Sequence, residues 1–99
     1  MIRLQIIEKS GAKLHKQIKD AMYSGKLKTF TAQKRGKKVT HTNNSYPGWM
    51  NMSPSSGVIN CEVLSPQKPG EEWRLLSAFI GRLSDKYSKD IHSINIQFE

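Results

Sequence analysis

The sequence predicts an α+β fold, a two-layer sandwich in which two helices cover one face of a mostly antiparallel sheet. Short segments with alternating apolar and polar residues predict six strands, and two longer segments with apolar residues three and four positions apart predict helices. Their order is β-α-β-β-β-β-α-β, which fits one sheet and one helical layer. A ferredoxin-like arrangement with an extra hairpin is one topology that this order allows. The 99 residues are expected to form a single domain, residues 1–99.

The first two elements are a strand over residues 2–7 and a helix over residues 12–23. IRLQII alternates apolar and polar side chains, as a half-buried strand does. Ser10 is the residue expected to cap the start of the helix. The helix carries a narrow apolar stripe of Leu14, Ile18 and Met22. So few large apolar residues predict packing on a sheet rather than insertion into a membrane surface.

A hairpin is predicted in FTAQKRGKKVTHT, residues 30–42, with Arg35 and Gly36 as the two central turn residues. Glycine at that place supplies the positive φ that a tight turn needs. This register puts Phe30, Ala32, Val39 and His41 on one face. The polar residues Thr29, Thr31, Gln33, Lys38, Thr40 and Thr42 fall on the other face. The clean division between the two faces favours the register.

A second hairpin is predicted over residues 48–64, with a four-residue loop over residues 54–57. That loop would place Met52 opposite Ile59 and Met50 opposite Cys61 on the apolar face. Trp49 would lie opposite Glu62 on the polar face. The second hairpin therefore repeats the division into an apolar and a polar face.

The last two elements are a helix over residues 71–87 and a strand over residues 91–98. The helix is the most strongly periodic segment, and its apolar stripe comprises Trp73, Leu76, Phe79, Ile80, Leu83 and Tyr87. The closing strand, IHSINIQF, alternates apolar and polar residues. The strand order within the sheet is left open by the sequence.

The charge is high and unevenly distributed. The net charge is +8, and residues 1–42 contain eleven Lys and Arg against two acidic residues, a local net charge of +9. Residues 43–99 contain five basic and six acidic residues, a net charge of −1. A one-sided basic charge with a pI near 9.8 is typical of a protein that binds a polyanion such as nucleic acid.

The candidate binding residues are the cations at the tip of the first hairpin and two polar neighbours on the sheet. The predicted nucleic-acid-binding residues are Lys34, Arg35, Lys37, Lys38, Thr40 and Trp49. Like charges facing each other across a hairpin cost about 0.2–1 kcal/mol, so an anionic partner is one reason to gather them. Protection of a sheet edge against aggregation is the competing reason. Trp49 could stack on a base, and the Thr40 hydroxyl could bind phosphate or sugar.

No motif in the chain fixes a reaction. The histidines and the single cysteine, Cys61, do not have metal-ligand spacing, and no phosphate loop or nucleophile elbow is present. We therefore expect no cofactor, no metal and no catalytic residue. One cysteine excludes an internal disulfide, and no secretory signal or membrane-spanning segment is visible, so a cytoplasmic location is expected.

The expected function is binding of RNA or single-stranded nucleic acid, without enzymatic activity. Duplex DNA is less favoured, because no helix combines basic residues with side chains that read bases. One alternative is a protein-binding adaptor or inhibitor module that uses the second helix around Ser77, Gly81 and Asp85. Another is a small metal-independent ribonuclease centred on His41 near Lys28 or Lys38.

Overall fold

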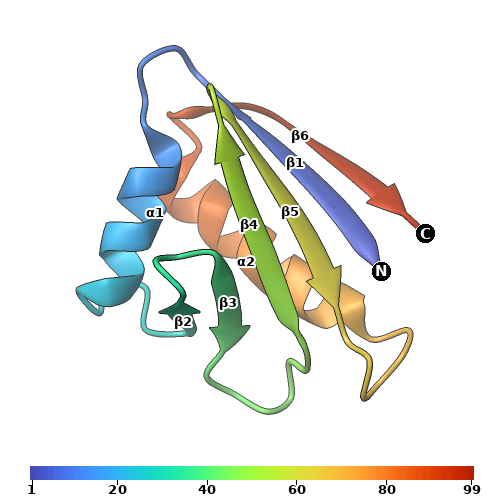
Figure 1. The fold of residues 1–99 in the computed structure, drawn as a ribbon. Helices are drawn as coiled ribbons and strands as arrows, with labels where there is room; N and C mark the ends of the chain where they lie inside the picture. Colours follow the sequence, from blue (N-terminus) through green and yellow to red (C-terminus); the bar gives the residue numbers. More distant parts are fainter.

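The computed structural model describes residues 1–99, and its elements follow the predicted order (Figure 1). They are β1 (Ile2–Glu8), α1 (Leu14–Tyr23), β2 (Phe30–Gln33), β3 (Lys38–His41), β4 (Trp49–Ser55), β5 (Val58–Leu64), α2 (Glu72–Tyr87) and β6 (Ile91–Phe98). The six strands form one sheet. The predicted α+β fold class is therefore confirmed.

The strands are arranged in the order β2-β3-β4-β5-β1-β6, and every neighbouring pair is antiparallel. The first strand, β1, lies between β5 and β6. Because both of these pair antiparallel with β1, they run parallel to each other and are joined by α2 as a split β-α-β unit. By the same rule β4 and β1 run parallel with β5 between them, so the order β4-β5-β1-β6 supports the ferredoxin-like expectation, with β2 and β3 as the extra hairpin at the edge.

One hydrophobic core joins both helices to one face of the sheet. It contains 20 buried residues, including Leu4 from β1, Val39 from β3 and Phe79 from α2. Across β1 and β5, Leu4 pairs with Cys61 and Ile6 with Ile59, so apolar residues line the same face. The intervening residues face away from the helices. The two helices therefore form one layer against the sheet, and the other sheet face stays uncovered.

The start of α1 differs from the prediction. The helix begins at Leu14, and the Glu8 carboxylate accepts the hydrogen bond of the Leu14 N–H in place of Ser10. Ser10 lies in a turn with Gly11 instead. A carboxylate also complements the positive end of the helix dipole. The cap thus comes from the end of β1, six residues away, where a search for a local capping residue does not find it.

The first hairpin has the predicted register, whereas the second is shifted by two residues. In the first, Phe30 pairs with His41, as expected. In the second, Met52 pairs with Cys61 and Trp49 with Leu64, because the turn has two residues rather than four. Ser56 and Gly57, with φ of 32° and 83°, form that turn. An even shift leaves each side chain on its predicted face.

The apolar face of α2 is turned slightly from the prediction. Leu75 is fully buried, together with Leu76, Phe79, Leu83 and Tyr87. Trp73, which the predicted stripe included, is 52% exposed. A helix advances about 100° per residue, so Trp73 lies at the edge of this stripe, beyond Ile80.

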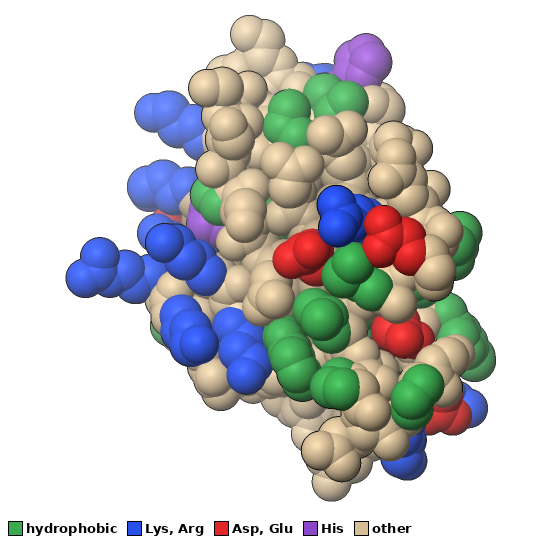
Figure 2. All heavy atoms as spheres, turned by 45° about the vertical axis from the view of Figure 1, so that its right-hand side comes forward, with side chains coloured by type: hydrophobic (Ala, Val, Ile, Leu, Met, Phe, Trp, Pro, Cys, Tyr) green, Lys and Arg blue, Asp and Glu red, His purple; other side chains and the backbone are tan.

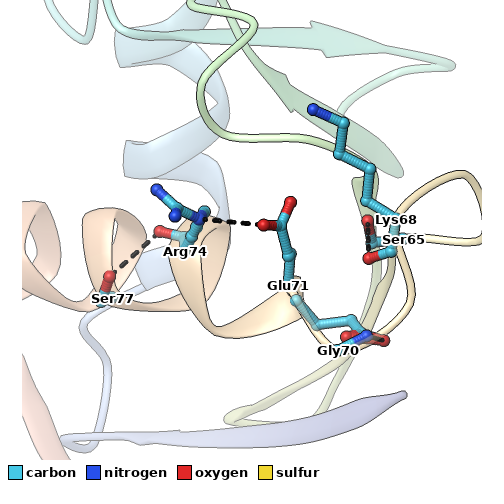
Figure 3. Close-up of polar contacts among 7 residues, drawn as sticks. Ser65, Lys68, Gly70, Glu71, Arg74 and Ser77 are labelled. Carbon is cyan, nitrogen blue, oxygen red and sulfur yellow. Dashed lines mark hydrogen bonds and ion pairs between the residues drawn. The ribbon is translucent and has the colours of Figure 1, made fainter.

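Acidic and hydroxyl side chains order the loop that leads into α2 (Figure 3). Ser65 donates a hydrogen bond to the Lys68 carbonyl at 3.0 Å, and the Gly70 N–H donates to the Glu72 carboxylate at 3.4 Å. Arg74 lies 3.7 Å from the Glu71 carboxylate. The basic group near the start of α2 is therefore paired with an acidic one.

Gly48, just before β4, allows the chain to pass close to the end of β5. Its φ is +87°, and a Cβ there would lie 2.0 Å from the Leu64 carbonyl oxygen. We expect Gly48→Ala to lower the free energy of unfolding by about 1–3 kcal/mol, measured by chemical denaturation. Gly70→Ala is the matched control, because Gly70 has the same φ with nothing within 4 Å. Equal losses in the two variants would show that the close approach to Leu64 is unimportant.

Candidate nucleic-acid interface

The six predicted binding residues lie in two adjacent groups. Lys34, Arg35 and Lys37 are exposed in the loop between β2 and β3. Lys38 and Thr40 on β3, with Trp49 on β4, are half-buried on the uncovered face of the sheet. Lys38 follows Lys37 directly, so the two groups are continuous along the chain.

The hairpin loop folds against α1 (Figure 1). Arg35 and Gly36 have φ of 60° and 83°, and the Lys37 N–H donates to the Lys34 carbonyl across them at 3.2 Å. Gly36 is buried, and a Cβ there would lie 2.9 Å from Cγ of Lys19. The aliphatic stem of Lys19 therefore lies on Gly36. We name the exposed cations of the loop, together with Lys19, the basic surface: Lys19, Lys34, Arg35 and Lys37.

Most cations of this region have no acidic partner. Of the eleven Lys and Arg in residues 1–42, only Arg3 and Lys16 lie within 4.0 Å of a carboxylate, which leaves nine without one. Figure 2 shows Lys and Arg side chains gathered along one side of the molecule, on the left, while the Asp and Glu side chains in this view lie mostly apart from them. The positive potential of the basic surface is thus not cancelled by neighbouring carboxylates.

His15 on α1 lies beside the basic surface, and its surroundings disfavour the protonated form of its ring. Burial lowers the pKa of His15, and the positive charge of Lys19 lowers it further, while a backbone contact with Gly36 acts in the opposite direction. Its Nε2 is shielded from solvent and has no hydrogen-bond partner. A neutral ring therefore fits this place under the hairpin loop better than a charged one.

The depressed pKa of His15 predicts a stability that falls in weak acid. Below the ordinary value of 6.5 the unfolded chain takes up a proton that the folded His15 resists, so unfolding is favoured as the pH falls. Above that value His15 is neutral in both the folded and the unfolded chain, so it does not make the stability depend on pH. We expect the Tm to decrease between about pH 7 and 5, and the decrease to be smaller in His15→Gln. An unchanged pH dependence in that variant would contradict this role.

On the sheet, Lys38 and Trp49 contact each other. The Lys38 ammonium lies 4.8 Å from the centre of the Trp49 ring, within the range of a cation–π interaction. Lys38 pairs with Asn51 and Val39 with Met50, so the same register carried one residue further puts Thr40 opposite Trp49. An ammonium, a hydroxyl and an indole ring therefore meet at one place. We name Lys38, Thr40 and Trp49 the sheet cluster.

The rest of the uncovered sheet face is polar but nearly neutral. Arg3 lies 3.1 Å from the Glu99 carboxylate and 3.9 Å from that of Glu62. Gln5 donates a hydrogen bond to Asn60 at 3.2 Å. Arg3, Gln5, Asn60 and Glu62 line a hollow of about 340 Å³ together with the amides Asn95 and Gln97 of β6. Thr29 departs from the predicted face, because it lines a hollow beside α2 with Ser77 and Gly81, and its shielded hydroxyl has no hydrogen-bond partner.

His41, the centre of the ribonuclease alternative, lies beside Phe30 as expected but has a different neighbouring cation. It packs on Phe30 and stacks on Tyr46 at 4.1 Å, and its Nδ1 accepts the Asn43 N–H at 2.9 Å. Burial lowers its pKa, and Arg82 lowers it further. Lys38 faces the opposite side of the sheet, so it is not the neighbouring cation. His41 thus packs between the Phe30 and Tyr46 rings, and its lowered pKa disfavours the charged form.

The structure also shows the surroundings of the single cysteine, Cys61, and of the α2 residues named in the adaptor alternative. Cys61 is buried, and burial raises the pKa of its thiol to about 12, so it is inert as a nucleophile at neutral pH. Gly81 has nothing within 4 Å of a Cβ placed on it, so α1 does not pack there. It lines a hollow of about 510 Å³ with Ser77, Asp85 and His41.

Sequence reasoning missed Lys19 and His15 as parts of the interface. Both lie on α1, and only the folding of the hairpin loop onto that helix brings them against Gly36 of the loop. The one local signal was that Lys19 lies beside the apolar stripe of α1, close to the side of the helix that packs on the rest of the chain.

No group of three or more His, Cys, Asp or Glu side chains is arranged to hold a metal ion. Neither helix is long and apolar enough to cross a membrane. Comparison of the chain with protein-family models, with curated proteins and with solved structures finds no match.

Proposed function

We propose that this protein binds RNA or single-stranded nucleic acid, with the basic surface on the phosphates and the sheet cluster on bases and sugars. The observation that carries the proposal is the group of nine cations without acidic partners in residues 1–42. Such a surface attracts a polyanion and releases its counterions. The cytoplasmic location and the absence of catalysis remain predictions of the sequence.

The position of the loop cations supports anion binding over edge protection. Edge protection acts through charges on the edge strand itself, and one or two usually suffice. Lys34, Arg35 and Lys37 lie in the loop, next to Lys19 of the helical layer. Their mutual repulsion is not relieved by any carboxylate, and phosphate groups would turn it into attraction.

Single strands are favoured over duplexes by the composition of the sheet cluster. The Trp49 ring is half-buried at the sheet surface, and stacking of a base on such a ring contributes about 1–3 kcal/mol. The bases of a single strand can turn toward a flat surface, whereas those of a duplex are stacked inside it. No helix presents basic and base-reading side chains together for a major groove.

The direct test is a titration of labelled RNA, single-stranded DNA and duplex DNA of matched sequence, followed by fluorescence anisotropy over a series of salt concentrations. We expect the single strands to bind more tightly than the duplex. The logarithm of their association constant should fall linearly with the logarithm of salt concentration, by about 0.7 for each phosphate contacted. Absence of binding at low salt would refute the proposal.

Two accompanying measurements separate the alternatives. Labelled RNA incubated with the protein should remain intact, and cleavage that is lost in His41→Ala would favour the ribonuclease reading instead. A pull-down with this protein from nuclease-treated lysate should no longer recover the proteins that nucleic acid links to it in untreated lysate. A protein partner that is retained, and released by substitution of Ser77 or Asp85, would favour the adaptor alternative.

A further inference from the structure

The two edges of the sheet are very different. The edge strand β2 has only four residues, and so short an edge offers little backbone for pairing with another strand. The other edge strand, β6, has eight residues and contains no Lys, Arg, Asp, Glu or Pro. One side of β6 pairs with β1, and no other strand pairs with its second side. A long, uncharged edge of this kind is open to pairing.

The apolar side chains of β6 are incompletely covered. Ile94 and Ile96 point to the helix side but are only half-buried, and Phe98 is 74% exposed. Figure 1 shows β6 as the outermost strand, at the right, away from α1. Trp73, at the start of α2, is 52% exposed and lines a hollow of about 440 Å³ together with Phe98. Isolated large apolar groups at a surface are common, but here they adjoin an open strand edge.

The sequence of β6 is complementary to itself in an antiparallel pair. The segment Ser93-Ile94-Asn95-Ile96-Gln97 has Asn at its centre, Ile on both sides and a polar residue at each end. A second copy centred on Asn95 would place Ile94 opposite Ile96 and Asn95 opposite Asn95. Opposed residues share a face, so apolar groups would meet apolar groups and amides would meet amides.

The charge distribution also fits a second copy of this chain. The basic surface lies at the β2–β3 end of the sheet, and β6 lies at the other end with three strands between β6 and β3. Two molecules joined through β6 would therefore keep their like charges far apart, and charges beyond about 10 Å are largely screened in physiological salt.

We infer that the protein forms a two-fold symmetric dimer in which the β6 strands of two copies pair antiparallel about Asn95. Such an interface is isologous, because the same strand supplies both sides. The two sheets become continuous, and Ile94, Ile96 and Phe98 of each copy gain apolar neighbours from the other. The dimer does not depend on nucleic-acid binding. If the proposed function also holds, one dimer carries two basic surfaces and binds a long strand more tightly than a monomer does.

The dimer is tested by light scattering coupled to size-exclusion chromatography, with charge substitutions at the symmetry centre. Asn95 is exposed, so Asn95→Lys and Asn95→Asp should each fold normally but be monomeric, because like charges would face each other. An equimolar mixture of the two variants should recover the dimer. The control Asn60→Lys, an exposed position on β5, should remain dimeric. A wild-type protein that is monomeric at high concentration, or an Asn95→Lys variant that stays dimeric, would overturn the inference.

Cross-linking supplies a second, independent readout. Opposed Cα atoms in an antiparallel pair are about 4.5–5.5 Å apart, which lies within the range of a disulfide. Asn95→Cys should therefore form a covalent dimer on mild oxidation, whereas Asn60→Cys should not. Cys61 is buried and does not compete, so the introduced thiol is the reactive one. Equal cross-linking of the two variants would show random collision and count against the dimer.

Discussion

Replacement of Lys34, Arg35, Lys37 and Lys38 by Ser is expected to weaken binding of single-stranded RNA by roughly 10²–10³-fold at about 0.1 M salt. Four lost phosphate contacts at about 0.7 in the salt slope account for that size, and the slope itself should become shallower by about 2.8. The free energy of unfolding should stay the same or rise, because relief of the repulsion among these cations, none of which has an acidic partner, offsets the lost contact of Lys38 with Trp49. Anisotropy titrations and chemical denaturation measure the two effects.

The matched control removes the same charge from another part of the molecule. It replaces the exposed residues Lys68, Arg82, Lys86 and Lys89 by Ser. Its net charge equals that of the loop variant, so long-range attraction is reduced equally. The control should keep most of the affinity and most of the salt slope. Equal losses in the two variants would show that net charge, rather than the hairpin loop, determines binding.

Phe79→Ala is expected to lower the free energy of unfolding by about 3–5 kcal/mol, the largest stability effect that we predict for a single change. Phe79 is 1% exposed and packs edge-on against Phe30, with ring centres 5.5 Å apart. Its removal leaves a cavity between α2 and the first hairpin, and a loss of this size approaches the whole stability of a small domain. Chemical denaturation followed by circular dichroism measures it.

Trp73→Ala, in the same helix, is the control for Phe79→Ala. Although the aromatic side chain removed is larger, Trp73 is 52% exposed, so we expect a loss of less than about 1 kcal/mol. Both variants should be measured in dilute solution, where self-association through β6 does not contribute. A larger loss in Trp73→Ala than in Phe79→Ala would contradict the observed orientation of α2.

The fold class, the element order and the division of each hairpin into two faces could be predicted because they depend on local periodicity. The Arg35-Gly36 turn could be placed because a glycine is needed there, and the register of the first hairpin followed from it. The second hairpin shows the limit of this reasoning. Both a four-residue and a two-residue turn kept Met50 and Met52 on the apolar face, so periodicity could not distinguish them.

The features that could not be predicted depend on contacts between distant segments. Glu8 caps α1 because β1 ends beside it, and Lys19 joins the loop cations because Gly36 packs on α1. The exposure of Trp73 depends on how α2 is rotated against the sheet, which the apolar stripe fixes only to within part of a turn. The six predicted binding residues could be proposed from the sequence because charge and strand alternation are local properties, and their role in binding stays a prediction. Their helical neighbours were not found.

We propose that a single strand of nucleic acid lies across the basic surface and the sheet cluster. A titration of isotopically labelled protein with single-stranded RNA, followed by NMR, tests it most directly. We expect the largest shifts in the amides of residues 34–38, at Lys19 and Thr40, and in the indole N–H of Trp49. Shifts confined to α2 or β6, with the hairpin loop and Trp49 unchanged, would contradict it.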